Sequence, residues 1–116
     1  MNIQRHQTSQ LMSQAVIHGD TIYLAGQVAD DPSADVRGQM RQILTKIDTL
    51  LGQLGSQRTC LLTANIWLAS MGDFADMNKE WEAWVPRRSA PARATVQATL
   101  FSSAHKVEIA VIAAAK

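Results

Sequence analysis

The clearest pattern in the chain is a set of hydrophobic residues spaced three and four apart between residues 36 and 54. This spacing places the hydrophobic side chains on one side of an α-helix, so it predicts a helix that packs on the core. The hydrophobic positions are Val36, Met40, Ile43, Leu44, Ile47, Leu50, Leu51 and Leu54. Ser33 or Asp35 is suited to cap the start of this helix, and Gly55 is suited to the left-handed conformation that ends it.

The other face of this helix is polar, and we expect it to be solvated. It carries Arg37, Gln39, Arg41, Gln42, Lys46 and Asp48. A core helix with one solvated face is a better interpretation of this pattern than a helix that binds a partner.

A second helix is predicted to begin at Asp73, whose side chain can cap it, and to end before Pro86, which cannot continue a helix. One of its faces is hydrophobic. That face carries Phe74, Met77, Trp81, Trp84 and Val85. We expect both tryptophans to lie in the core.

Between the two helices, residues 61–69 alternate in the manner of a strand with one buried face. Leu62, Ala64, Ile66 and Leu68 lie on one side of this strand, and Thr63, Asn65 and Trp67 lie on the other. Trp67 is large and costly to leave in water, so we expect it to mark an interface on the second face of the sheet.

The N-terminal region predicts a hairpin. Residues 12–17 and 22–25 are two apolar runs that flank a turn at Gly19 and Asp20. Residues Ile3 to Gln7 form a weak pattern, which we interpret as a short edge strand. Gly26 ends the second strand of the hairpin, at a position where a ligand or another backbone can come close.

The C-terminal region predicts a second hairpin, formed by residues 92–100 and 106–115 with Ser102 and Ser103 in its loop. Arg93 follows Pro91, which stiffens the backbone before it. A stiffly held guanidinium suits a carboxylate or phosphate ligand, although a surface arginine beside a strand is the plain alternative. Glu108 lies in an apolar run and needs a partner, for which Arg93 is the natural candidate if the strand register allows it.

The predicted order of elements is β-β-α-β-α-β-β, with a further strand at the start. This order favours an α+β fold with two helices on one face of a mixed sheet. A chain of 116 residues fits one domain, residues 1–116. The second face of the sheet carries Trp67, and we expect self-association to bury it.

Composition excludes several classes of function. A net charge of +1 with scattered basic residues argues against binding to nucleic acid or membrane. Cys60 is the single cysteine, which fits a reducing compartment, and the N-terminus lacks the apolar stretch of a signal peptide. We therefore expect a cytoplasmic protein.

No cofactor or metal is predicted. His6, His18 and His105 are isolated from one another and from Cys60, so no pair has the spacing of metal ligands. The chain has no glycine-rich phosphate loop and no nucleophile elbow around a serine. The remaining contest is between a hydrolase that acts on small molecules and a binding module without catalysis.

Four segments, in order, resemble the RidA/YjgF family. Pro91-Ala92-Arg93-Ala94-Thr95-Val96 is similar to its hallmark strand, and Val107-Glu108-Ile109 to the strand that follows. Tyr23-Leu24-Ala25-Gly26-Gln27-Val28 is similar to the strand that ends in Ser/Ala-Gly-Gln. Asp73-Phe74-Ala75-Asp76-Met77-Asn78 is similar to the start of the family's second helix.

This resemblance implies a chorismate-mutase-like fold of about six strands, assembled as a homotrimer with a ligand cleft at each subunit boundary. It also implies hydrolytic deamination of reactive 2-enamine and 2-imine acids, such as 2-aminoacrylate, to 2-keto acids and ammonia. In that interpretation Arg93 anchors the substrate carboxylate, and Glu108 positions the attacking water. Gly26, Asn78 and Thr95 line the cleft, although Asn78 is equally well explained as a surface amide. The alternative is a trimer of the same family that binds small carboxylates without turnover.

The chain differs from the best-studied branch of the family at three positions. Met12 replaces a tyrosine that lines the cleft, Thr95 replaces a cysteine, and Ala110 replaces a second glutamate after Glu108. The sequence therefore predicts a divergent branch, with low activity or a different preferred side chain.

Overall fold

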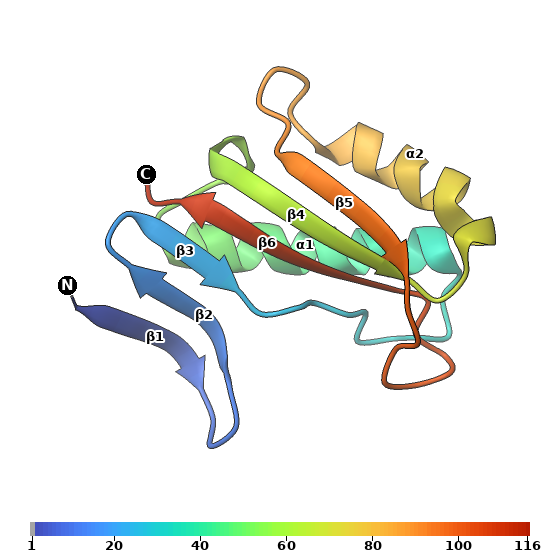
Figure 1. Ribbon diagram of the computed structural model, residues 1–116, viewed down its shortest axis with the longest axis horizontal. Helices are drawn as coiled ribbons and strands as arrows, with labels where there is room; N and C mark the ends of the chain where they lie inside the picture. Colours follow the sequence, from blue (N-terminus) through green and yellow to red (C-terminus); the bar gives the residue numbers. More distant parts are fainter. Residues whose placement is uncertain (1) are drawn as a thin grey trace.

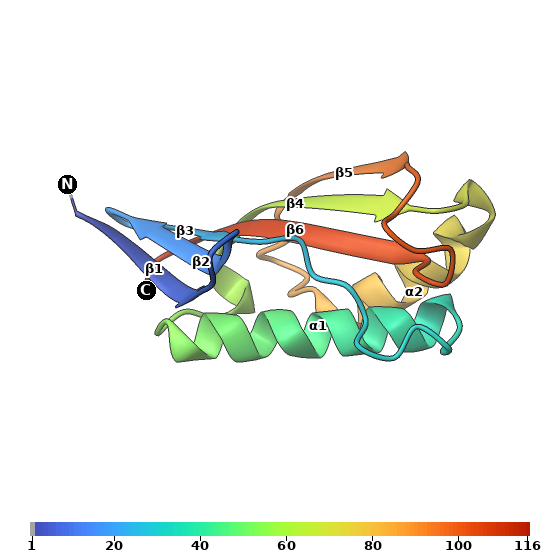
Figure 2. The same cartoon turned by 90° about the horizontal axis from the view of Figure 1, so that it is seen from below.

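The computed structural model describes residues 2–116 as a six-stranded mixed sheet with two helices (Figure 1). The strands are β1 (Ile3–Thr8), β2 (Ser13–His18), β3 (Thr21–Leu24), β4 (Leu61–Leu68), β5 (Ala92–Gln97) and β6 (Val107–Ala114), and the helices are α1 (Val36–Gln53) and α2 (Phe74–Trp84). The strand order is β1-β2-β3-β6-β4-β5, and only β4 and β5 pair in parallel. Figure 2 shows both helices beneath the same face of the sheet. The predicted α+β architecture is confirmed.

The N-terminal hairpin has the predicted form. His18 pairs with Thr21, so Gly19 and Asp20 alone form the turn between β2 and β3. Gly19 has a φ of 62°, which glycine adopts without the steric penalty that a Cβ brings. The predicted edge strand is also present, because β1 pairs with β2 alone.

The predicted C-terminal hairpin is wrong. β5 and β6 are not neighbours, because β4 lies between them and pairs with both. The connection through α2 returns the chain parallel to β4, so β5 becomes the outer edge of the sheet. The apolar run of β6 is instead a central strand between β3 and β4, where its buried face meets α1.

Helix α1 begins and ends as predicted. The Asp35 side chain accepts a hydrogen bond of 2.8 Å from the Gly38 N–H, and Gly55 follows the helix with a φ of 74°. Gln39, however, was predicted to be solvated and is fully buried. Its Nε2 donates to the carbonyl oxygens of Pro32, Ala34 and Ala104, and its Oε1 accepts from the Lys106 N–H. One glutamine thus forms hydrogen bonds with two backbone groups in the segment before α1 and with two in the connection between β5 and β6. These bonds explain its burial.

Helix α2 buries the predicted side chains Met77, Trp81 and Trp84. The two tryptophan rings lie 5.5 Å apart between centroids, and Trp84 Nε1 donates to Asp48 Oδ2 at 3.0 Å. Asp73 precedes the helix as predicted, but its side chain forms no capping hydrogen bond. A 3-10 turn over Met71–Asp73 leads directly into the helix and takes the place of such a cap.

Strand β4 buries Ala64, Ile66 and Leu68 as predicted, and Trp67 lies half-buried on the other face. Leu62 was predicted to share the buried face and is instead 47% exposed. The register with β6 shifts between Leu61 and Thr63, so Leu62 falls out of the alternation.

Glu80 of α2 joins the two helices. Its carboxylate accepts from Arg37 Nε at 2.8 Å and from Arg41 Nε at 3.0 Å, both from α1. Burial raises the pKa of Glu80, but the two arginine hydrogen bonds outweigh it and hold the pKa below its ordinary value. This contact fixes α2, and therefore one side of the candidate site, against α1.

Candidate functional site

Gly26 lies against the carboxylate of Glu108. Tyr23 pairs with Ile112, and Gln27 pairs with Ile109. The segment from Tyr23 to Gln27 therefore spans four residue steps opposite only three steps of β6. The extra residue makes a bulge between Tyr23 and Gln27, and bulges are a common way to re-aim the backbone beside a site. A Cβ at Gly26 would lie 3.0 Å from the Glu108 carboxyl carbon and would overlap its Oε2. Only glycine fits here without displacing Glu108.

Glu108 lies on the sheet face that the helices leave uncovered, which we call the open face. Its neighbours Val107 and Ile109 are buried on the helix-covered face, while Glu108 is half-buried opposite them. Glu108 pairs with Trp67, and Trp67 pairs with Val96, so the three residues form a row across β6, β4 and β5. Within residues 2–116 no cation forms an ion pair with Glu108. The carboxylate is therefore available to a ligand or a water.

Arg93 lies on the helix-covered side of the edge strand β5. It pairs with the buried Ala64, and its Nη1 donates to Asn78 Oδ1 at 2.7 Å. Its guanidinium carbon lies 5.8 Å from the centroid of the Phe74 ring and 5.7 Å from that of the Trp81 ring. These contacts hold an exposed guanidinium that has no carboxylate partner among residues 2–116. An arginine held in this way is suited to binding an anion.

Asn78 supports Arg93 in this arrangement. Its amide nitrogen donates to Glu82 Oε1 at 3.1 Å, which turns its oxygen toward the Arg93 guanidinium. Phe74, Asn78 and Trp81 are spaced four and three residues apart, so one face of α2 presents all three. The sequence predicts Phe74 and Trp81 only as members of the hydrophobic face of this helix, although their spacing from Asn78 already places them beside it.

Thr95 lies two residues after Arg93 and therefore on the same face of β5. It pairs with the buried Ile66. Its Oγ1 is buried and has no hydrogen-bond partner among residues 2–116. A buried hydroxyl without a partner is uncommon, and it gives this side of the strand an unused donor and acceptor.

The five predicted site residues thus form two groups. We call Arg93, Asn78 and Thr95 the arginine half-site, and Gly26 and Glu108 the glutamate half-site. The sheet separates the two groups, because the arginine half-site lies on the helix-covered face and the glutamate half-site on the open face. The expected pairing of Arg93 with Glu108 is therefore wrong, since β4 separates their strands and their side chains point to opposite faces.

The other two substituted positions, Ala110 and Met12, lie outside the two groups. Ala110 pairs with Asn65 and lies on the open face, two residues from Glu108. Met12 lies between β1 and β2 and is 49% exposed. Its carbonyl oxygen accepts a hydrogen bond from the Ser9 N–H.

Neither a metal site nor a membrane-spanning helix is present in the part of the chain that the structure describes. Among residues 2–116 no three His, Cys, Asp or Glu side chains gather closely enough to hold a metal ion. Within the same range, no helix has the length and apolar character that crossing a membrane requires.

A cleft of about 340 Å³ lies between the β1–β2 hairpin and α1, and none of the five predicted site residues lines it.

Comparison with known proteins gives matches along nearly the whole chain. The family model described as Endoribonuclease L-PSP matches residues 3–115. The RutC family protein YoaB of Escherichia coli K12 is 43% identical over 114 residues, covering 98% of this chain and 99% of that protein. The 2-iminobutanoate/2-iminopropanoate deaminase of Bos taurus is 34% identical over 107 residues, covering 87% of this chain and 77% of that one.

The fold is also similar to solved structures. The crystal structure of NMB1025, a member of the YjgF protein family from Neisseria meningitidis, superimposes with a TM-score of 0.97 and 36% sequence identity. The match covers 100% of this chain and 97% of that one.

Proposed function

The chain belongs to the RidA/YjgF family, whose family model is described as Endoribonuclease L-PSP, and on this premise we propose that it hydrolyses reactive 2-enamine and 2-imine acids to 2-keto acids and ammonia. The names of the family and of its members point in different directions, to an endoribonuclease and to an imine deaminase. The names alone do not choose between these activities. The choice depends on the chemistry of the two half-sites.

The observation that carries the proposal is the Glu108 carboxylate, held against Gly26 and free of any ion pair within residues 2–116. A carboxylate in this state can accept a proton from a water, which is what general-base catalysis of hydrolysis requires. Arg93 supplies a planar fork for the substrate carboxylate. Few other groups are needed, because an imine carbon is already electrophilic.

The proposed reaction adds one water and releases one ammonia. Glu108 takes a proton from the water as the water oxygen bonds to the imine carbon, and the C=N electron pair moves to nitrogen, which takes that proton from Glu108. Glu108 then passes the hydroxyl proton of the resulting carbinolamine to nitrogen, and its collapse forms the C=O bond, breaks the C–N bond and releases ammonia. An enamine first gains a proton at carbon and loses one from nitrogen to become the imine. Arg93 holds the substrate carboxylate throughout and is not consumed.

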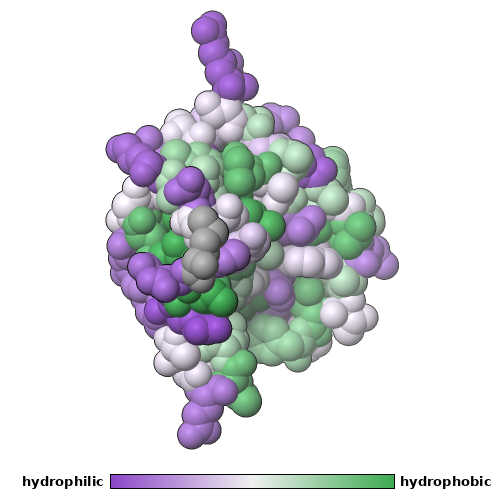
Figure 3. All heavy atoms as spheres, turned by 60° about the vertical axis from the view of Figure 1, so that its left-hand side comes forward, coloured by the Kyte–Doolittle hydropathy of each residue, from purple (hydrophilic) through white to green (hydrophobic). Residues whose placement is uncertain are grey.

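A single chain has its two half-sites on opposite faces of one sheet, so we propose that a second copy supplies one of them. Arg93 lies on the edge strand β5, where no further strand blocks access to the neighbouring surface. The open face carries Tyr23, which is 43% exposed, and Val96, which is 51% exposed and pairs with the half-buried Trp67. Figure 3 shows other hydrophobic residues on the surface, mixed with hydrophilic ones, on the side of the N-terminal hairpin. Packing the open faces together would bury such side chains in the homotrimer that the family resemblance implies.

The alternative function is binding of small carboxylates without turnover. Arg93, Asn78 and Thr95 would serve that function equally well, so arginine variants do not separate the two. Ala110 removes one acidic group from the open face, and Met12 brings no hydroxyl, which favours low activity or a different preferred side chain. The role of Glu108 distinguishes an enzyme from a binder.

The test is release of 2-keto acid when the protein is added to an amino-acid oxidase or dehydratase that generates the intermediate, across several amino-acid precursors. We expect the protein to accelerate release above the spontaneous rate. Glu108→Gln keeps the shape of the side chain but removes the base, so we expect turnover to fall by about 100-fold or more while 2-keto acid binding persists.

Asp20→Asn is the matched control, because it makes the same carboxylate-to-amide change at an exposed residue outside both half-sites. It should retain turnover. No acceleration with any precursor would favour the binding module, and full activity in Glu108→Gln would remove Glu108 from the mechanism.

A further inference from the structure

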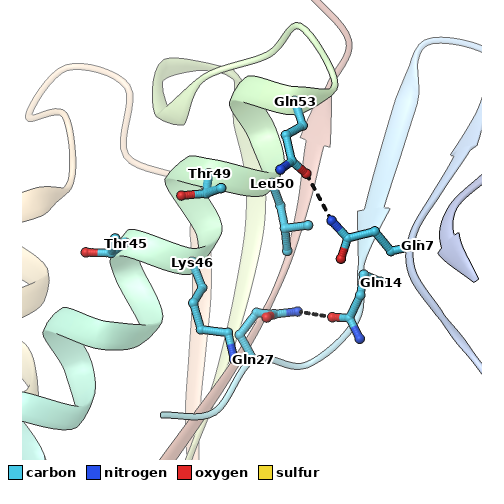
Figure 4. A pocket seen from close by; sticks show the side chains of 8 residues that line it. All are labelled: Gln7, Gln14, Gln27, Thr45, Lys46, Thr49, Leu50 and Gln53. Atoms are coloured by element: carbon cyan, nitrogen blue, oxygen red, sulfur yellow. Dashed lines mark hydrogen bonds between the residues drawn. The ribbon is translucent and has the colours of Figure 1, made fainter. Parts of the chain in front are cut away.

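The cleft between the β1–β2 hairpin and α1 is lined by four glutamines from four separate parts of the chain (Figure 4). Gln7 lies in β1, Gln14 in β2, Gln53 in α1, and Gln27 in the segment after β3. They are joined in pairs. Gln27 Nε2 donates to Gln14 Oε1 at 3.1 Å, and Gln7 Nε2 donates to Gln53 Oε1 at 3.2 Å. Leu50 contributes an apolar wall between the pairs.

Gln7 takes part in this arrangement through an unusual backbone. Its φ of 50° lies in the left-handed region, and it is the one non-glycine residue within 2–116 that adopts such an angle. In a regular strand His6 and Gln7 would point to opposite faces. Here both donate to Gln53 Oε1, His6 at 2.8 Å and Gln7 at 3.2 Å. A strained backbone that turns a side chain toward a cleft is characteristic of functional sites.

Gln27 has a polar atom left unused. The residue is only 3% exposed, and its Nε2 is occupied by Gln14 Oε1 and the Ala25 carbonyl oxygen. No donor within residues 2–116 bonds its Oε1, which points away from Gln14 on the cleft side (Figure 4). The oxygen is still open to solvent in the cleft, because the one enclosed side-chain polar atom without a partner within residues 2–116 is Thr95 Oγ1. A ligand N–H in the cleft would replace the water that this oxygen can bind.

Charge in the cleft is already balanced. Lys46 lines it, but its Nζ donates to Asp30 Oδ1 at 2.9 Å and to the Val28 carbonyl oxygen at 3.0 Å. A carboxylate ligand would therefore compete with Asp30 for the single cation that lines the cleft. Glutamine amides each offer both donors and an acceptor, which match the donors and acceptor of another amide.

We propose that this cleft is a second binding site, distinct from both half-sites, for an uncharged small molecule that presents a planar amide or ureide group. The ligand N–H donates to Gln27 Oε1, and its carbonyl oxygen accepts from the glutamine amide hydrogens that face the cleft. Its apolar part lies against Leu50. The left-handed backbone at Gln7 lets its amide hold the Gln53 amide in place.

The test uses the full-length protein, labelled with nitrogen-15, and follows the side-chain amide signals of the glutamines during titration. Propionamide and methylurea are the probes, and propionate is the charged control of the same shape. We expect saturable shifts of the four cleft glutamines with a millimolar dissociation constant for the two neutral probes and none with propionate.

Two variants remove different parts of the cleft. Gln27→Leu removes the unused oxygen, and Gln53→Leu removes the acceptor from an exposed helix position, so each should weaken binding by about tenfold or more. Gln10→Leu is the matched control, since Gln10 is exposed in the β1–β2 connection and does not line the cleft. Gln7→Gly relieves the left-handed strain and should weaken binding without lowering the melting temperature.

Three outcomes would overturn the proposal. The first is a set of shifts that grow without saturating for both neutral probes, and the second is an equal response to propionate. The third is unchanged affinity in both Gln27→Leu and Gln53→Leu. Because Gln53 is exposed, loss of folding in Gln27→Leu alone would leave the second variant to decide.

Discussion

The two half-sites are held by different means. The arginine half-site lies on an edge strand, and its guanidinium is positioned by the Asn78 amide and by the rings of Phe74 and Trp81. The glutamate half-site lies on a central strand, and its carboxylate lies against Gly26 and takes part in no ion pair within residues 2–116. Side chains of one helix hold the cation, whereas a glycine leaves room for the anion.

This difference matches the roles proposed for the two groups. A binding arginine keeps its charge in any surroundings, so aromatic and amide contacts can fix it without impairing it. A general base must keep a lone pair free for the proton that it accepts, so space beside a glycine suits it better than an ion pair. In the proposed mechanism each half is incomplete alone, because neither face of one chain carries both Arg93 and Glu108.

The largest expected effect comes from combining two inactive variants. If each site takes Arg93 from one copy and Glu108 from another, co-expressed Arg93→Ala and Glu108→Gln chains should recover activity. In trimers assembled at random from equal amounts, roughly a quarter of all sites would be complete, which is roughly a third of the sites in assemblies that hold both variants. Keto-acid release from doubly tagged assemblies measures the recovery.

The controls are each variant alone and a mixture of the two variants after separate purification. Both controls should be inactive, unless subunits exchange in the mixture. Light scattering on the same samples should give about three times the monomer mass. A doubly tagged assembly without activity would mean that one chain unites both groups, and a monomer would remove the shared site altogether.

A smaller effect is expected from Gly26→Ala. The added Cβ would overlap Glu108 Oε2, so the carboxylate must move and turnover should fall by about tenfold to 100-fold. Folding should be nearly unaffected, because Gly26 is exposed and the atom it meets ends a flexible side chain. Keto-acid release and thermal unfolding, measured together, separate the two effects.

Gly52→Ala makes the same substitution in α1, where a Cβ meets nothing within 4 Å. It should raise the free energy of unfolding by about 0.5–1 kcal/mol and leave turnover unchanged. Equal turnover in the two variants would show that the approach of Gly26 to Glu108 has no catalytic consequence.

Much of the fold could be predicted, because its signals are local. The period of α1, the cap at Asp35 and the two-residue turn at Gly19 all depend on residues within a few positions of one another. The failures were non-local. Gln39 has the polarity of a surface residue, and its burial depends on carbonyl groups up to 65 positions away.

The candidate site likewise depends on both local and non-local features. The motifs around Arg93 and Glu108 were visible in the sequence, but whether the two side chains meet depends on strand order, which no local pattern contains. Adjacent apolar runs favour a hairpin on grounds of loop entropy. Here the crossover through α2 places β4 between them, and burial of β6 as a central strand outweighs the shorter loop.

The smallest expected effect concerns the contact that holds α2, and with it the arginine half-site, against α1. The pKa of Glu80 is held below its ordinary value of 4.5 by Arg37 and Arg41, against the effect of burial. Because the folded pKa is the lower one, the contact stabilises the protein fully above pH 4.5 and loses its effect as the pH falls through the folded pKa. Glu80→Gln should therefore lower the free energy of unfolding by about 1 kcal/mol at pH 7, with little difference from the parent protein once Glu80 is protonated in both states.

Thermal unfolding at one protein concentration measures this effect, and we expect the melting temperature to fall by about 4 °C at neutral pH. Asp20→Asn removes an exposed carboxylate that has no ion pair within residues 2–116 and should shift neither value. A difference that persists unchanged at acid pH would mean that packing of the Glu80 side chain, rather than its charge, joins the two helices.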